Sequence, residues 1–172
     1  MAWTNGPLVL YHGCDDGSAR SIANSGINLS LCAKLTDFGQ GFYTTTNLVQ
    51  AKNWANERCR RLSLASGTMP TAAVVQFDVD RDQLARLEFL AFITENSNND
   101  FWDLIFRCRQ TLPPGQHNRS INTEYDVVCG PVTLWPQTLV IKDCDQISFH
   151  TPSGLGCLST IAIPFLGTPL FP

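Results

Sequence analysis

The sequence predicts a single domain of the α+β class with mainly antiparallel strand pairing. Strand-like and helical segments are mixed along the 172 residues, and the last strand-like segments follow one another without a helix between them. A chain of this length is most simply one domain over 1–172, with a core over about 8–151 and an apolar tail over 152–172.

The first 46 residues predict three strands and a helix. Apolar, β-prone residues predict a strand over 7–13, and a short helix is expected over 18–25 with Gly26 as its stop. A short strand is expected over 27–31. The segment DFGQGFYTTT at 37–46 combines glycines with aromatic and β-branched residues, which predicts a turn that leads into a strand.

The clearest helix and the clearest strand come next. A helix is predicted over 47–64, capped by Asn47. Its apolar stripe has spacings of three and four: Leu48, Ala51, Ala55, Cys59 and Leu62. The run AAVVQFDV at 72–79 predicts a strand that is buried at its start.

The second half alternates less regularly. Helices are expected over 81–93 and 101–109, the second capped from within 96–100, and a polar loop is expected over 112–123. Strands are expected last, over 124–129, 139–142 and 146–150, the first of them ended by Gly130 and Pro131. The tail after Thr151 is rich in apolar residues, glycine and proline, which suits a segment that covers a core face or a partner surface.

Composition excludes some classes of partner. Charged residues make up 16% of the chain and the net charge is −3, whereas charged residues make up roughly 25% of an average soluble protein. A net negative charge speaks against binding to nucleic acid or to an anionic membrane surface.

Cysteine usage points to a reducing compartment. The seven cysteines are widely spaced and include no C-x-x-C pair, so neither a zinc site nor a redox dithiol is expected. Cys59, Cys108 and Cys129 are predicted to be small buried residues. Because the N-terminal residues lack the basic and apolar regions of a signal peptide, a cytoplasmic protein is expected, with a secreted or delivered effector as the alternative.

Three residues are candidates for chemistry, each with a plainer structural alternative. His12 ends an apolar strand, where it is either a core histidine or a hydrogen-bond partner for a sugar hydroxyl. Because Gly13 beside it has no side chain, its backbone N–H and C=O are accessible to a ligand. One donor and one acceptor are the groups that pair with a carboxamide. Tyr43 is either a core aromatic or a platform for a flat cationic heterocycle, and Trp54 on the next helix has the same two readings.

Glu124 is the third candidate. A charged residue at the start of a strand is commonly exposed to solvent. In a pocket, its carboxylate would stabilise the oxocarbenium-like transition state of glycosidic bond cleavage and accept a proton from the incoming nucleophile. Asp126, two residues later on the same predicted strand face, is the rival for this role.

Three blocks of the chain resemble the ADP-ribosyltransferase superfamily, in its His-Tyr-Glu branch that includes the poly(ADP-ribose) polymerases and diphtheria toxin. They are LYHGC at 10–14, DFGQGFY at 37–43 with QAKNW at 50–54 behind it, and NTEYDVV at 122–128. The chain also resembles a small group of stand-alone domains of unknown function with DFGxGFY and YDxVxGPV motifs, and DQISFHT at 145–151 belongs to this similarity.

The resemblance implies a split antiparallel β-sheet sandwich flanked by helices, with NAD as co-substrate. His12 would bind the ribose next to adenine and Gly13 the carboxamide. Tyr43 would stack on nicotinamide, Trp54 would supply the second stacking aromatic, and Glu124 would be the catalytic carboxylate.

The resemblance has departures. Cys14 stands where the polymerases have a serine that contacts ribose, and Ala51 lies near the position of the serine that holds the carboxamide. Asp126 offers a second carboxylate on the aligned strand.

The expected activity is that of a mono-ADP-ribosyltransferase, which cleaves nicotinamide from NAD and transfers ADP-ribose to a macromolecular acceptor or to itself. Hydrolysis of NAD at the same site is one alternative, and an inactive NAD-binding interaction module is the non-enzyme alternative. No metal is expected. The weak basic character speaks against an RNA 2′-phosphotransferase.

Overall fold

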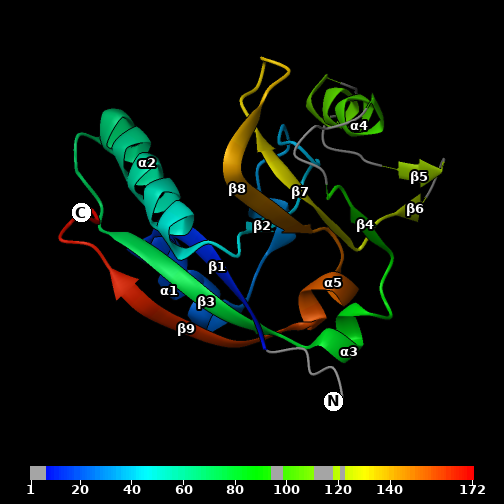
Figure 1. The fold of residues 1–172 in the computed structure, drawn as a ribbon. Coiled ribbons are helices and arrows are strands. Elements are labelled where there is room, and N and C mark those ends of the chain that lie inside the picture. The colour runs from blue at the N-terminus through cyan, green and yellow to red at the C-terminus, as the bar shows by residue number, and fades with distance from the viewer. Residues whose placement is uncertain (1–6, 94–98, 111–117, 121–122) are drawn as a thin grey trace.

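The computed structural model describes residues 7–93, 99–110, 118–120 and 123–172, and they form an α+β fold built on two main sheets (Figure 1). The first sheet has the order β1-β3-β9, from Leu8–Asp15, Ala72–Val79 and Leu158–Leu166. The second has the order β2-β8-β7-β4, from Phe42–Thr44, Val140–Phe149, Val127–Thr133 and Phe89–Ala91. A separate two-stranded sheet joins β5 (Asn118–Ser120) and β6 (Thr123–Glu124).

Strand pairing confirms the predicted class. Every described pair is antiparallel except β4 with β7. The two main sheets meet at one isolated bridge, where Tyr11 and Thr45 exchange two hydrogen bonds of 2.9 Å. Among the described residues β1 and β2 pair only at this bridge, and this junction of the two sheets is called the split.

The helices cover the sheets from different sides (Figure 1). The helices of the described residues are α1 (Asp16–Ser25), the 3-10 helix η1 (Leu29–Leu31), α2 (Leu48–Ser66), α3 (Arg81–Leu84), α4 (Asn99–Gln110) and α5 (Pro152–Gly156). None of the helices in the described part of the chain is long and apolar enough to cross a membrane.

Three clusters of buried residues form the core. One lies between the two sheets and joins Leu10 and Phe77 to Phe42 and Phe149. The second lies under α4, and the third joins α2 to β3. Burial of these apolar side chains is the main favourable contribution to folding.

The strongest local patterns in the sequence were read correctly. The strand predicted over 72–79 is β3 residue for residue. Asn47 is the N-cap of α2, because its side-chain oxygen accepts hydrogen bonds from Val49 N and Gln50 N. Gly26 follows α1 with φ of 79°, as a C-terminal glycine should.

Two predictions between residues 27 and 93 were wrong. The strand expected over 27–31 is the 3-10 helix η1, because the Asn28 side chain accepts hydrogen bonds from the nitrogen and hydroxyl of Ser30 and turns the chain locally. The helix expected over 81–93 ends at Leu84, and β4 follows at Phe89–Ala91 because this segment pairs with β7.

The end of the chain also differs from expectation. The strand expected over 124–129 is two strands, and β7 continues through Gly130 and Pro131 to Thr133. The two strands expected over 139–150 are one strand, β8. Its pairing with β7 shifts register in the polar middle of the strand, where Asp143 has φ of 57°.

Other parts of the expected loop and tail are strands. Asn118–Ser120 in the expected loop forms β5, while 111–117 and 121–122 lie outside the described residues. The tail contributes β9 to the first sheet and covers the core beside α2 with Phe171.

Candidate functional site

Gly13 lies where β1 passes under α2. A Cβ atom at this position would come within 2.0 Å of the Ala51 carbonyl oxygen and 2.9 Å of the Ala55 nitrogen. The two backbones are therefore in direct contact, which glycine alone permits. The sequence suggested that this glycine makes room for a ligand, and the structure adds that it makes room for the helix.

The backbone polar groups of Gly13 point into the split between the sheets. Tyr11 pairs with Thr45 across the split, and in an antiparallel strand every second residue directs its N–H and C=O to the same side. Gly13, two residues after Tyr11, therefore directs one donor and one acceptor toward β2. The Tyr43 carbonyl, which a continued ladder would pair with Gly13, accepts a hydrogen bond from His12 Nδ1 at 2.7 Å.

His12 is half-buried and neutral at physiological pH. Its ring packs against Phe42 with 4.4 Å between centroids. Desolvation lowers the pKa of the imidazole from 6.5 to about 4, although the hydrogen bond to the Tyr43 carbonyl opposes the shift. Because Nδ1 donates to that carbonyl, Nε2 is an acceptor. A sugar hydroxyl is the kind of donor that such a nitrogen accepts from.

Tyr43 is held by the loop that precedes it. Its hydroxyl accepts hydrogen bonds from Phe38 N and Thr36 Oγ1, both at 2.9 Å, and donates to the Gly39 carbonyl at 2.8 Å. The ring lies parallel to Phe38 at 6.4 Å and edge-on to His150 at 6.3 Å. Burial raises the pKa of the phenol. The hydroxyl is therefore a structural tether, and the ring packs against the buried cluster under α4.

Trp54 lines a cavity on α2, whereas Cys14 is part of the core between the sheets. Trp54 is half-buried on α2 and lines a cavity of about 410 Å³ that also includes Arg58 and Arg61. Arg58 is held by Asp15, with Nε and Oδ2 2.8 Å apart. Cys14 is buried in the core between the sheets, and burial raises the pKa of its thiol to about 12. Its side chain therefore serves packing.

Glu124 lies apart from these residues. It ends β6, which pairs with β5, and Figure 1 shows this small sheet beyond β4, on the opposite side of the second sheet from β1. The structure thus brings His12, Gly13 and Tyr43 together and places the backbone of Glu124 elsewhere. The Glu124 side chain lies outside the described part of the structure.

Asp126, the rival carboxylate, has structural partners. Its side chain accepts hydrogen bonds from Glu88 N at 3.0 Å and from the Thr151 hydroxyl. Its backbone carbonyl accepts a hydrogen bond from His150 N. These bonds connect the chain before β4 to the N-cap of α5.

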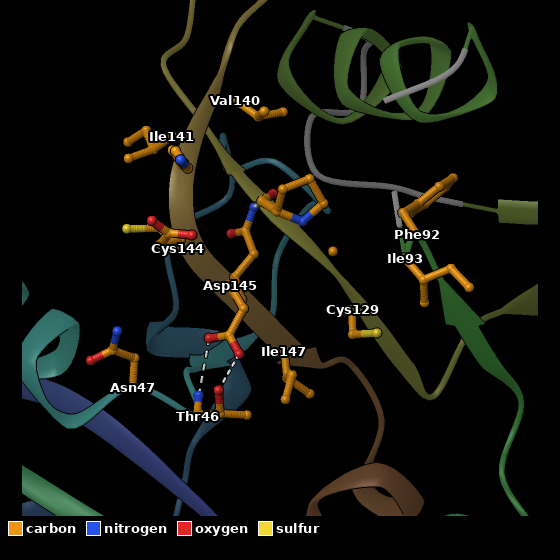
Figure 2. A pocket seen from close by; sticks show the side chains of 15 residues that line it. Thr46, Asn47, Phe92, Ile93, Cys129, Val140, Ile141, Cys144, Asp145 and Ile147 are labelled. Carbon is orange, nitrogen blue, oxygen red and sulfur yellow. Dashed lines mark hydrogen bonds between the residues drawn. The ribbon is translucent and has the colours of Figure 1, made fainter. Parts of the chain in front are cut away.

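Sequence reasoning missed a cavity of about 550 Å³ beside the N-terminus of α2 (Figure 2). Its walls come from β7, β8 and the end of β4, with Thr46 and Asn47 at the helix. Asp145 borders it, and its carboxylate accepts hydrogen bonds from the Thr45 hydroxyl and from the hydroxyl and nitrogen of Thr46. The sequence motif at 145–151 lies in this strand, but its residue types alone indicated no function.

Metal ligation has no support in the described residues, where no group of three His, Cys, Asp or Glu side chains is placed to hold an ion. The cysteines are all free thiols.

Comparison with known proteins adds one finding. A search of curated proteins found no match. The model of a family described as "Protein of unknown function (DUF3990)" matches residues 8–134, a region that runs from the start of β1 to just past the end of β7. Because the match covers more than half of the chain, the protein belongs to the DUF3990 family.

Proposed function

We propose that this protein is an NAD-dependent mono-ADP-ribosyltransferase that releases nicotinamide and transfers ADP-ribose to a macromolecule or to itself. The observation that carries the proposal is the arrangement of Gly13 at the split. Its backbone donor and acceptor are directed toward β2, next to the neutral imidazole of His12 and to Tyr43. The proposal includes membership of the ADP-ribosyltransferase superfamily, which the three sequence blocks resemble. It also includes the fold of that superfamily, a split antiparallel sheet.

Each residue has a defined part in the proposed binding step. Gly13 pairs its N–H and C=O with the carboxamide of nicotinamide. The ring of Tyr43 offers an electron-rich face to the pyridinium, an interaction of about 1–2 kcal/mol when desolvated. His12 accepts a hydrogen bond from a ribose hydroxyl through Nε2. Trp54 stands on α2 as the second aromatic.

The proposed reaction breaks the bond between the ribose C1′ and the nicotinamide nitrogen. The bonding electron pair leaves with nicotinamide and neutralises its ring, and the sugar develops oxocarbenium character. An acceptor nucleophile then donates an electron pair to C1′ and loses its proton to a carboxylate, proposed to be Glu124. This assignment requires β6 to approach the split. Asp126 is the weaker choice because Glu88 and Thr151 already hold its carboxylate.

One observation favours a second candidate. Because β6 lies beyond β4 (Figure 1), a protein in which it stays there would bind NAD without cleaving it. This is the NAD-binding interaction module. NAD hydrolysis by water differs from transfer only in the nucleophile.

The decisive experiment uses NAD labelled in both its nicotinamide and its adenine part, incubated with the protein and a cell lysate. Released nicotinamide with labelled macromolecule supports transfer, and released nicotinamide with free ADP-ribose alone supports hydrolysis. Binding without release supports the interaction module, whereas the absence of binding contradicts the proposal.

Variants of the two carboxylates sharpen the result. Glu124→Gln is expected to keep NAD affinity and lose most nicotinamide release, with Asp126→Asn as the matched variant. Full activity in Glu124→Gln together with none in Asp126→Asn would move the role to Asp126.

A further inference from the structure

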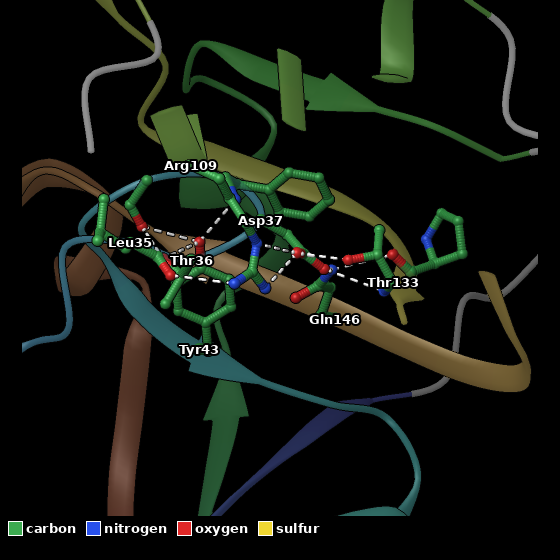
Figure 3. A network of polar contacts seen from close by, with 10 residues as sticks. Leu35, Thr36, Asp37, Tyr43, Arg109, Thr133 and Gln146 are labelled. Carbon is green, nitrogen blue, oxygen red and sulfur yellow. Dashed lines mark hydrogen bonds and ion pairs between the residues drawn. The ribbon is translucent and has the colours of Figure 1, made fainter. Parts of the chain in front are cut away.

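Asp37 is a buried carboxylate at the centre of a polar network (Figure 3). It is 3% exposed and accepts hydrogen bonds from side chains or backbone of three elements. Arg109 of α4 donates through Nε and Nη2 at 2.9 and 2.6 Å. Thr133 at the end of β7 donates through its nitrogen and hydroxyl at 3.0 and 2.6 Å, and Gln146 of β8 donates at 2.6 Å.

This network satisfies a group that would otherwise be costly to bury. A buried carboxylate loses its hydration and needs both an opposite charge and several donors. Arg109 supplies the charge with two donors, and its guanidinium also lies over the Trp135 ring at 5.6 Å from the centroid. The result is a fixed point at which α4, β7 and β8 meet one short loop.

The loop anchored by Asp37 is the one that holds Tyr43. The residues on either side of Asp37 both donate to the Tyr43 hydroxyl, Thr36 from its side chain and Phe38 from its nitrogen. Gly39 accepts from that hydroxyl. A displacement of Asp37 would therefore move two donors and one acceptor of Tyr43 at once.

We propose that Asp37 is a positioning residue, which fixes the ring of Tyr43 through the loop over 36–39 and thereby sets the affinity of the site for a flat cationic heterocycle such as the nicotinamide of NAD. The inference rests on the proposed function. It adds that ligand affinity depends on a carboxylate that the ligand never touches. Buried charged networks of this kind are rigid only when every member is satisfied.

A double-mutant cycle tests the coupling. Asp37→Asn replaces one acceptor oxygen by an N–H₂ group, which cannot accept the hydrogen bonds that the surrounding donors offer. Tyr43→Phe removes the hydroxyl that the loop binds and keeps the ring. We expect each single variant to raise the Kd for NAD about tenfold, because a small misplacement of a binding group costs about this much or more. The double variant is expected to match either single variant, not the roughly hundredfold loss of independent sites.

Steady-state nicotinamide release separates positioning from stability. Loss of position raises KM with a smaller change in kcat, while a merely structural role lowers the amount of active protein and so lowers kcat at unchanged KM. Asp80→Asn is the matched control, because the described hydrogen bonds of the Asp80 side chain go to Asp82 and Gln83 of α3. If Asp37→Asn does not fold, Thr133→Val takes its place, since it removes one side-chain donor to Asp37 and keeps the shape.

The outcomes separate the two proposals. Multiplicative effects of Asp37→Asn and Tyr43→Phe on Kd, or unchanged Kd in Asp37→Asn, would overturn the positioning role while leaving NAD binding in place. Failure of the unsubstituted protein to bind NAD would overturn the proposed function, and the inference with it.

Discussion

Gly13→Ala tests the contact on which the candidate site is built. The added Cβ would lie 2.0 Å from the Ala51 carbonyl oxygen, where real Cβ contacts are rarely closer than 3.0–3.4 Å. The obstacle is helix backbone, which cannot rotate away as a side chain does. The separation of β1 and α2 must therefore increase by about 1 Å.

The size of the effect follows from this displacement. Overpacking in a core costs about 1–3 kcal/mol, and the shift also loosens the contacts of Ala51, Ala55 and Cys59 with the first sheet. We expect a loss of about 3 kcal/mol in the free energy of unfolding. For a domain of this size, about 2–4 °C of Tm accompanies each kcal/mol, so Tm should fall by about 6–12 °C.

The assay is urea and thermal unfolding followed by circular dichroism. Gly156→Ala is the matched control, because a Cβ at that position meets no atom within 4 Å. If the Tm of Gly13→Ala lay within about 2 °C of the control, the backbone contact between β1 and α2 would be refuted.

Three further predictions concern a titration, a set of thiols and the tail. In the unfolded chain His12 is protonated below about pH 6.5, whereas in the folded protein its pKa is about 4. Acidification between these two pH values should therefore lower the free energy of unfolding by up to about 3 kcal/mol. Unfolding of His12→Gln at pH 7 and pH 4.5 should lack this loss, and an identical pH dependence would contradict the assignment. Burial raises the pKa of Cys108 to about 12 and of Cys157 to about 11, so iodoacetamide at pH 8 should modify them only after unfolding, as peptide mass spectrometry would show. Asn56→Ala removes both side-chain partners of the buried Phe171 backbone, N–H and C=O, and should cost about 2–3 kcal/mol in urea unfolding; stability equal to that of the unsubstituted protein would argue against the tail as part of the core.

Local patterns predicted the elements that depend on local forces. The β3 run and the α2 stripe with its Asn47 cap are specified by residues within the segment itself. The helix expected through Phe89 failed because pairing with β7, nearly 40 residues away, outweighs its local preference. The polar middle of β8 reads as a strand end in sequence, yet neighbours on both sides carry the strand through it.

The proximity of three candidate residues was predictable for the same reason. His12, Gly13 and Tyr43 stand at the ends or centres of well-patterned strands, so their proximity follows from the meeting of β1 and β2. The hydrogen-bond partners of Asp37 come from three elements far apart in sequence, so no local sequence pattern predicts them. The packing of Gly13 against α2 was likewise invisible, since a glycine looks the same whether a ligand or a helix fills the space above it.

The place of β8 constrains the order in which this protein can be assembled. In the second sheet β8 lies between β2 and β7, which it follows in the chain. During synthesis, at about 5–20 residues per second, β2 emerges roughly 100 residues before the strand that it pairs with. Its unpaired edge is exposed throughout that interval. A chain that stops at residue 134, where the family match ends, would lack the central strand of one sheet and the outer strand of the other, and should aggregate instead of folding.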